Sequence, residues 1–322
     1  MINRLSTVLE CSRVFALPMT IMAWFVAFTY AVSVSGNVNF GLIALLGLAL
    51  VHLSANILDD YFDYKTLIKQ VNYDKQEYLK NSQKTKCRLL VLGYIKEKEL
   101  LIIAAIYLAI AGSIGLFFYL KCGVGVIYYT IIGGIIAIFY SFLSKLRLSE
   151  LAIALAYGPA LFGGVYYVMT KTYSWEVFLL SVPTMLVTVI LLYIHTIMDF
   201  KFDLNEGHKT IANSFKSQKD ALVILKWLLI LAYTTPLLLC IFDVLDWQVC
   251  LVWATIPLAK DLYKSLELFA ENPDSIPEHK WYHFPMENMR NAPSFMIRMY
   301  QSRNLTIYYS LILALAIVLA LN

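Results

Sequence analysis

Long apolar runs separated by polar segments are the dominant pattern along the chain. Each run holds about 20 residues with few charges, which is the length at which a helix crosses a bilayer. Nine such runs are present, at residues 14–34, 38–62, 99–120, 124–143, 149–170, 175–198, 220–241, 246–266 and 304–321. A helix satisfies its own backbone hydrogen bonds in lipid. We therefore predict an all-α polytopic membrane protein, a bundle of nine transmembrane helices with polar connections.

The composition supports a membrane protein. Of the 322 residues, 60% are hydrophobic and 15% are charged, whereas a soluble domain has about a quarter charged residues. The first run continues to spanning length without a small-residue cleavage site, so no cleavable signal peptide is expected. The five scattered cysteines form no CxxC pair, which argues against a zinc site or a disulfide framework.

The basic residues predict the orientation. If the N-terminus is cytoplasmic, 23 of the 26 Lys and Arg residues fall on the cytoplasmic side, as the positive-inside rule requires. We predict an integral cell (inner) membrane protein with the C-terminus outside. Its single domain, residues 1–322, would have three long cytoplasmic connections, at 64–98, 199–219 and 260–303. Within the last one, 295–303 mixes apolar and basic residues, which suits an interfacial helix that caps a site or a membrane-resting connector.

Two acidic clusters end two of the apolar runs and carry the candidate chemistry. Asn56, Asp60 and Asp63 share one helical face, because residues three or four apart are neighbours; Asp59 is rotated by about 100° and should point elsewhere. Asp199 and Asp203 repeat the spacing of four. Carboxylate and amide oxygens suit Mg²⁺, which is usually completed by substrate phosphates. A solvated helix end explains either cluster alone, but explains two on one side of the membrane less well.

Basic residues accompany both clusters. Lys84, Lys86 and Arg88 follow the first cluster, Lys145 and Arg147 follow the fourth run, and Lys209 follows the second cluster. Such charges would neutralise a diphosphate, above all as a leaving group. The alternative is that the positive-inside rule alone places most of them. A spacing of four also links His52 to Asn56 and His195 to Asp199, which suggests two related half-bundles or a coincidence. His195 could orient Asp199 or handle a proton, or simply pack within its helix.

These motifs, taken in order, resemble the UbiA superfamily of intramembrane prenyltransferases, and most closely the MenA-type 1,4-dihydroxy-2-naphthoate prenyltransferases. The matching positions are Asn56, Asp60 and Asp63; Arg88 through Gly93; Tyr140 and Ser141; Ser149 and Glu150; Gly158 and Pro159; and Asp199, Asp203, Gly207 and Thr210. The chain departs from the pattern at Asp59, Leu89 and Ser149 and in the connection 260–303, which bears on the identity of the acceptor.

The resemblance implies a magnesium-dependent transfer of an isoprenyl group from a prenyl diphosphate to an aromatic, quinone-precursor-like acceptor, with dihydroxynaphthoate and menaquinone biosynthesis as the specific expectation. It implies two Mg²⁺ ions held by Asn56, Asp60, Asp63, Asp199 and Asp203. It also implies that Asn56, Arg88, Lys145 and Lys209 bind the diphosphate, and that Tyr140 lies near the reacting carbon. The catalytic residues would be Asp60, Asp63, Asp199, Asp203 and Tyr140. No nucleic acid partner is expected.

Two alternatives remain open at this point. A terpene cyclase on the same scaffold would ionise the same diphosphate without an external acceptor. A transporter or lipid-binding protein would hold a polyprenyl phosphate without turnover, although such a site does not need two carboxylate clusters on one face of the membrane.

Overall fold

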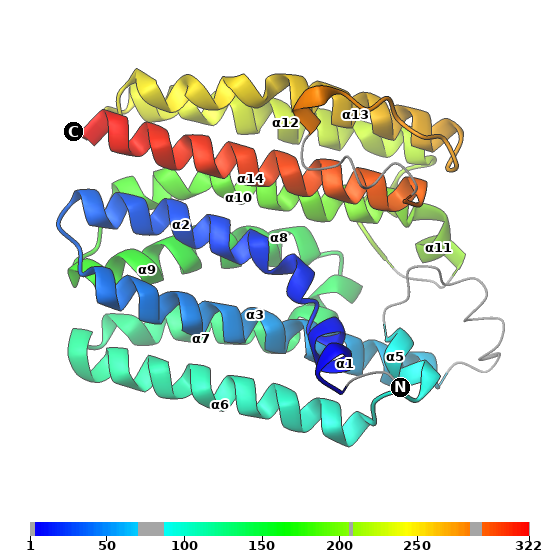
Figure 1. The fold of residues 1–322 in the computed structure, drawn as a ribbon, viewed down its shortest axis with the longest axis horizontal. Helices are drawn as coiled ribbons and strands as arrows, with labels where there is room; N and C mark the ends of the chain where they lie inside the picture. The colour runs from blue at the N-terminus through cyan, green and yellow to red at the C-terminus, as the bar shows by residue number, and fades with distance from the viewer. Residues whose placement is uncertain (1–3, 70–86, 206–208, 284–291, 322) are drawn as a thin grey trace.

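The structure, a computed structural model, describes residues 4–69, 87–205, 209–283 and 292–321. Within these ranges every regular element is a helix and no strand occurs. The long helices run side by side along the longest dimension of the molecule (Figure 1). The predicted all-α membrane bundle is therefore confirmed.

Eight helical segments in the described ranges are long and apolar enough to cross a membrane. They are η1 (Val14–Ala16) with α2 (Leu17–Ser33), α3 (Val38–Leu67), α6 (Glu97–Cys122), α7 (Gly125–Lys145), the segment α8 (Ser149–Leu155) with η2 (Ala156–Ala160) and α9 (Leu161–Thr170), α10 (Trp175–Met198), α12 (Gln218–Ile241) and α14 (Ser294–Leu321).

The eighth apolar run, residues 246–266, has a different character. Residues 246–266 fall in η4 (Trp247–Thr255) and α13 (Ile256–Glu271). Along α13 the buried residues recur every three or four positions, as in Leu262, Leu266 and Phe269, while Lys260 and Lys264 are exposed. This periodicity is typical of an amphipathic helix, and α13 packs with its apolar face on α12 and α14.

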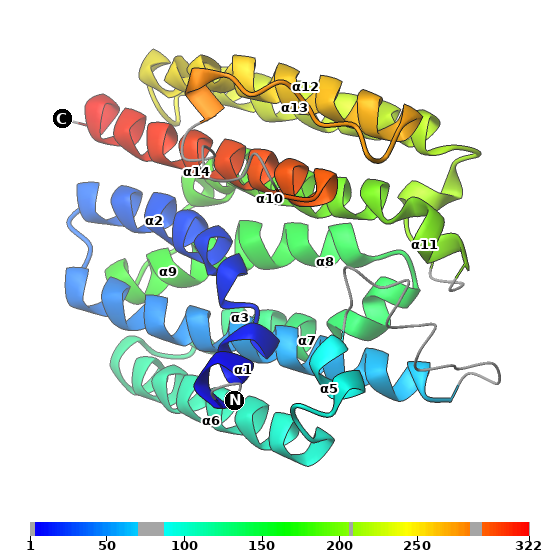
Figure 2. The same cartoon turned by 45° about the vertical axis from the view of Figure 1, so that its right-hand side comes forward.

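The helices form two neighbouring groups. Both views place α2, α3, α6, α7 and α9 on one side and α10, α12, α13 and α14 on the other (Figures 1 and 2), and α14 contacts α2 where the groups meet. In α10, 67% of the most apolar window is buried, compared with 11% in α6. α10 is thus a central helix, whereas α6 presents most of its surface outward.

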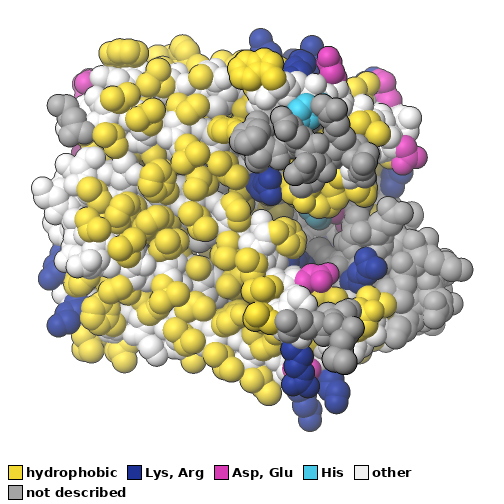
Figure 3. All heavy atoms as spheres, viewed as in Figure 1, with side chains coloured by type: hydrophobic (Ala, Val, Ile, Leu, Met, Phe, Trp, Pro, Cys, Tyr) yellow, Lys and Arg dark blue, Asp and Glu magenta, His cyan; other side chains and the backbone are white. Residues whose placement is uncertain are grey.

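The outer surface fits a lipid environment. Hydrophobic side chains cover the left and central part of the face in Figure 3, and charged side chains gather toward its two ends, mainly on the right. On α6 the exposed residues include Ile102, Ile106 and Ile110, one helical turn apart. Such a continuous exposed apolar surface is expected where a protein meets acyl chains rather than water.

Side-chain caps explain where three of the spans begin. Asn37 Oδ1 accepts a hydrogen bond from the Phe40 amide at 3.1 Å at the start of α3. Ser174 and Ser217 cap α10 and α12 in the same way. Because the first amides of a helix have no partner within it, such caps stabilise the start of each helix by about 1 kcal/mol.

A kink interrupts the fifth span. Gly158 has a non-helical backbone (φ −92°, ψ −110°) within the π-helical segment η2, and Pro159, which lacks an amide hydrogen, follows it. A Cβ atom at Gly158 would lie 2.9 Å from Met185 Sδ, so a larger residue would require the Met185 side chain to move. This π-bulge changes the direction of the span and the positions of the side chains on it.

The short helices α1 (Arg4–Cys11), α5 (Arg88–Leu92) and α11 (Phe200–Asn205) lie at the end of the bundle that holds the N-terminus, and the C-terminus lies at the opposite end (Figure 1). The connections at this end are shorter than predicted. α3 continues to Leu67, α13 continues to Glu271, and α14 begins at Ser294. Residues 295–303 are therefore the first turns of a spanning helix, so the prediction of a separate interfacial helix is wrong.

Arg298 explains this correction. Its guanidinium is fully buried and donates hydrogen bonds to the carbonyl oxygens of Ser265 (2.8 Å), Ser275 (3.0 Å) and Ser294 (3.1 Å). Because protein oxygens satisfy its donors, the guanidinium can be buried, and Arg298 does not interrupt α14.

Candidate active site

The first acidic cluster lies on the last turns of α3. Asp59 is 3% exposed and Asp60 is 13% exposed, although both stand near the end of the helix. Buried carboxylates need compensating charge or hydrogen bonds, because the loss of water costs several kcal/mol for each ion. The surroundings of α3 therefore determine what this cluster can do.

Arg13 provides that compensation. One guanidinium nitrogen lies 3.5 Å from Asp59 Oδ2 and another contacts Asp60 Oδ1. Burial alone would lower the pKa of Arg13, but the carboxylates of Asp60 and Asp59 raise it above its ordinary value, so the guanidinium stays charged. Asp59 is rotated by about 100° from Asp60 on the helix, but the forked guanidinium of Arg13 contacts both carboxylates, so Asp59 takes part in the surroundings of the cluster.

The backbone at Arg13 brings its side chain to α3. Arg13 lies between α1 and η1 with φ 50° and ψ 48°, the left-handed region that a residue with a side chain adopts only at a cost of about 1 kcal/mol. This turn directs the chain from α1 into the first span. Its neighbour Ser12 accepts a hydrogen bond from Asn56 Nδ2 at 3.3 Å through its carbonyl oxygen. The bond directs the amide oxygen of Asn56, which is the atom a cation would bind, away from Ser12.

Asp63 links α3 to α7. Ser141 Oγ donates to Asp63 Oδ1 at 3.2 Å, and both residues are buried. Tyr140, which precedes Ser141 on α7, is half-buried. The tyrosine predicted to lie near the reacting carbon is therefore next in sequence to the residue that holds a carboxylate of the first cluster.

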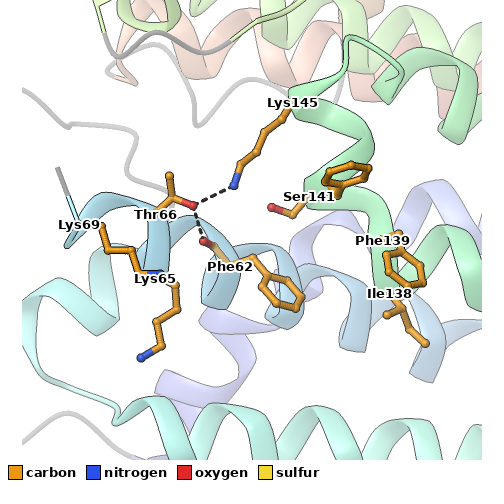
Figure 4. A pocket seen from close by; sticks show the side chains of 9 residues that line it. Phe62, Lys65, Thr66, Lys69, Ile138, Phe139, Ser141 and Lys145 are labelled. Atoms are coloured by element: carbon orange, nitrogen blue, oxygen red, sulfur yellow. Dashed lines mark hydrogen bonds between the residues drawn. The ribbon is translucent and has the colours of Figure 1, made fainter.

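A cavity of about 590 Å³ opens between α3 and α7 (Figure 4), and its lining includes Ser141, whose hydroxyl donates to Asp63. Lys145 lies at its charged end, where its Nζ donates to Thr66 Oγ1 at 2.8 Å. The full lining is Phe62, Lys65, Thr66, Lys69, Ile138, Phe139, Ser141, Phe142 and Lys145. The combination of three lysines with a mainly aromatic wall suits an amphiphile that has an anionic head and an apolar tail.

The second acidic cluster lies where α10 passes into α11. Asp199 is the residue after α10, and the Asp203 amide donates to the Asp199 carbonyl oxygen at 2.8 Å, so the predicted spacing of four is kept across the junction. His195 Nδ1 lies 3.1 Å from Asp199 Oδ2. The imidazole ring meets Phe295 of α14 edge to face, with 5.6 Å between ring centroids.

Figure 1 shows the end of α3, α5 and α11 at the same end of the bundle. Helix ends that are distant in the sequence are therefore brought to one face of the molecule, as predicted. Arg88, at the start of α5, and Lys209 are both exposed. Lys84, Lys86 and Gly207 lie outside the described residues.

No three His, Cys, Asp or Glu side chains of the described ranges gather closely enough to hold a metal ion by themselves. The predicted cage is therefore not closed by protein carboxylates alone. The donors at each helix end still fit Mg²⁺, because its sites commonly combine one or two carboxylates with phosphate oxygens and water. The cationic Arg13 on Asp59 and Asp60 shows that the first cluster accommodates positive charge.

The sequence reasoning missed two features. It did not single out Arg13, whose only signal is a basic residue directly before the first span. It also did not connect Tyr157 with His52, although Tyr157 forms a polar cluster with Thr20 and His52 inside the bundle.

The comparisons with known proteins identify the family. The UbiA prenyltransferase family model matches residues 17–284, which includes both acidic clusters. The chain belongs to the UbiA prenyltransferase family. A comparison with curated protein sequences gives no match.

Three solved structures show the same fold. A structure described for digeranylgeranylglyceryl phosphate synthase has a TM-score of 0.58 and 16% identity, and the match covers 98% of each chain. The apo UbiA homologue from Aeropyrum pernix K1 has a TM-score of 0.58 and 14% identity, over 94% of this chain and 98% of the other. The UbiA homologue from Archaeoglobus fulgidus bound to GPP and Mg²⁺ has a TM-score of 0.57 and 15% identity, and the match covers 95% of this chain and 99% of the other.

Proposed function

We propose that this UbiA family protein transfers an isoprenyl group from a prenyl diphosphate to an aromatic acceptor in a Mg²⁺-dependent reaction. The observation that carries the proposal is the position of two acidic clusters, from α3 and from the α10–α11 junction, at one end of the bundle. The family match over residues 17–284 supports it, as does the binding of GPP and Mg²⁺ by the structurally similar homologue from Archaeoglobus fulgidus.

Each cluster has a defined part in the proposal. Asn56, Asp60 and Asp63 would hold one Mg²⁺ ion, and Asp199 and Asp203 would hold a second. The two ions neutralise the diphosphate and make it a better leaving group. Protein side chains complete this neutralisation: Arg88, Lys145 and Lys209 supply positive charge at the same end of the bundle. Ser141 and His195 orient carboxylates, because each contacts one aspartate of its own cluster.

The reaction breaks the bond between the allylic carbon and the diphosphate oxygen, and the electron pair leaves with the diphosphate. A carbon of the electron-rich acceptor ring then forms a bond to the allylic carbon, and the proton on that carbon leaves. With a dihydroxynaphthoate acceptor the bond would form at the carbon that bears the carboxylate, and CO₂ would leave in place of the proton. Tyr140 is our candidate for stabilising the allylic cation through its ring face. The buried setting of the first cluster excludes water that would otherwise capture this cation.

We place the site on the cytoplasmic side of the cell membrane. The support is the charge pattern, because 23 of 26 Lys and Arg residues fall on the side that holds both clusters. The N-terminus lies at the same end of the bundle as α5 and α11, and the C-terminus lies at the other end (Figure 1). A quinone precursor such as 1,4-dihydroxy-2-naphthoate is the acceptor we expect, which would give the protein a role in menaquinone biosynthesis.

The test uses the purified full chain in lipid nanodiscs with Mg²⁺ and geranyl or geranylgeranyl diphosphate. Diphosphate release and products are measured with and without 1,4-dihydroxy-2-naphthoate or 4-hydroxybenzoate. Release that depends on an acceptor, together with a prenylated ring in the mass spectrum, supports the transferase. A cyclic hydrocarbon formed without acceptor identifies a terpene cyclase. Tight binding of the diphosphate without any turnover identifies a lipid-binding or transport protein.

A further inference from the structure

Three polar side chains from three different helices meet in the interior of the bundle. His52 Nδ1 of α3 lies 2.7 Å from the Tyr157 hydroxyl of η2 and 2.8 Å from Thr20 Oγ1 of α2. The two hydroxyl oxygens are 3.1 Å apart. We call these three residues the His52 cluster. Polar groups inside membrane spans are costly, and a group of three indicates either a helix-packing contact or a functional site.

One atom of the cluster distinguishes these two explanations. His52 Nε2 is shielded from solvent and has no hydrogen-bond partner among the described residues. A cluster that served packing alone would gain nothing from leaving this nitrogen unsatisfied, because a buried polar atom without a partner costs about 1–3 kcal/mol. In either tautomer Nδ1 is engaged by hydroxyl groups, so Nε2 is left as one donor or one acceptor for an added ligand.

The cluster lies next to the first acidic cluster. His52 precedes Asn56 by four residues, so it lies one turn, about 6 Å, further into the bundle on the same face of α3. The N-terminal segment connects the two places: Ser12 and Arg13 contact Asn56, Asp59 and Asp60, and Thr20 follows on α2. A molecule bound at the His52 cluster would therefore lie beside the proposed site of ionisation.

The π-bulge places the third member. Tyr157 is part of η2, directly before the kinked Gly158 and Pro159. The extra residue in a π-helical turn shifts the side chains out of the regular register, and here Tyr157 reaches both α2 and α3. Such bulges recur at functional sites, and this one sits where the three helices meet.

We propose that the His52 cluster binds a ring hydroxyl of the aromatic acceptor, a proposal that rests on the function proposed above. The chemistry of the His52 cluster does not suit the prenyl diphosphate, neither its diphosphate group nor its tail. It contains two neutral hydroxyls and one imidazole but no Lys or Arg, so it offers no permanent charge to a diphosphate. A prenyl tail has no polar atom to satisfy Nε2. A hydroxylated ring provides one donor and acceptor oxygen on an otherwise apolar molecule, which matches one unsatisfied nitrogen within an apolar bundle.

The experiment compares three variants with the wild-type protein in nanodiscs: Tyr157→Phe, His52→Leu and Tyr166→Phe. Tyr166→Phe is the matched control, because it removes a tyrosine hydroxyl from the same span, about two and a half turns nearer the other end. The KM values for 1,4-dihydroxy-2-naphthoate and for geranylgeranyl diphosphate are measured separately. We expect the acceptor KM to rise about tenfold in Tyr157→Phe and His52→Leu, the cost of a lost hydrogen bond. The diphosphate KM should change less than about twofold, and Tyr166→Phe should resemble the wild type.

A second readout separates acceptor binding from a general loss of structure. Inhibition constants are measured for 1-hydroxy-2-naphthoate and for 2-naphthoate, which lacks the hydroxyl. The hydroxylated compound should bind more tightly to the wild type, and this preference should disappear in Tyr157→Phe. An unchanged acceptor KM in both variants, or equal rises in the KM of both substrates, would overturn the inference. If the wild type released diphosphate without any acceptor, the proposal of an acceptor site would also be contradicted. If it released no diphosphate at all, the proposed function itself would be rejected.

Discussion

The end of α3 and the α10–α11 junction both carry acidic clusters with the same spacing, but the two surroundings differ. At α3, Asp59 and Asp60 are enclosed and paired with Arg13. At the junction, Asp199 is paired with His195, whose side chain is 37% exposed. The first cluster thus contacts a guanidinium, which is permanently charged, whereas Asp199 of the second contacts an imidazole. This difference indicates that the first cluster is the more preorganised half of the site.

The histidines that precede the clusters show the same contrast. His52 and His195 each stand four residues before the first donor of a cluster. His195 contacts its aspartate, whereas His52 contacts Thr20 and Tyr157. The two histidines therefore have the same spacing from their clusters but make different contacts. A duplication of half-bundles stays a prediction, and the divergence at these positions is where the halves would have specialised.

The largest effect is expected from removing a proposed metal ligand. Asp60→Ala or Asp203→Ala should lower the rate of diphosphate release by at least about 10³-fold, because the loss of metal-assisted neutralisation costs several kcal/mol of transition-state stabilisation. The rate is measured with saturating Mg²⁺, and unfolding temperatures verify that the variants are folded. The exposed Asp274 provides a control, since Asp274→Ala should be fully active. Full activity of either cluster variant in the presence of EDTA would contradict the account.

The next effect concerns stability and applies to one cluster only. Arg13→Ala leaves Asp59 and Asp60 buried without their cation, which should cost about 3 kcal/mol. Thermal unfolding in EDTA should show this loss, and Mg²⁺ with a prenyl diphosphate analogue should recover more stability in the variant than in the wild type. Arg13→Lys keeps the charge but loses the fork that reaches both carboxylates, so an intermediate loss is expected. Equal stability of Arg13→Ala and the wild type would show that the contact is not structural.

A smaller effect is expected at the second cluster. His195→Ala removes the hydrogen bond to Asp199 and should lower the rate about tenfold at limiting Mg²⁺, with less loss at saturating Mg²⁺. The rate is measured across a Mg²⁺ titration. His279→Ala supplies the control, since it removes a histidine from the connection between α13 and α14. A rate loss that is independent of Mg²⁺ would mean that His195 acts in some way other than positioning Asp199.

The smallest effect is expected in the cavity of Figure 4. Lys145 is exposed and contacts Thr66, so Lys145→Ala should raise the KM for the prenyl diphosphate only about threefold, as expected for a screened charge. Thr66→Val tests whether the hydrogen bond or the charge matters, and it should have little effect. A rise in the acceptor KM instead of the diphosphate KM would reassign this cavity.

The parts of the fold that follow from local sequence were predictable. The apolar runs predicted the eight long helices. The spacing of the acidic residues predicted which of them share a helical face, and the distribution of Lys and Arg predicted that both clusters lie on one side. The pairing of Arg13 with residues 46 and 47 positions away depends on tertiary packing, and no local pattern reveals it. The burial of Arg298 against three carbonyl oxygens likewise depends on tertiary packing, so the mixture of apolar and basic residues in 295–303 did not reveal that this segment continues into α14.

Our central proposal is that both acidic clusters bind the same diphosphate through Mg²⁺ ions. An experimental structure of the full chain with Mg²⁺ and geranyl S-thiolodiphosphate tests it most directly. The account predicts two metal ions bridged by one diphosphate, one ion ligated by Asp60 or Asp63 and the other by Asp199 or Asp203, with ions only a few bond lengths apart. A diphosphate that lies against one helix end alone, with the other carboxylates directed into solvent, would contradict the account.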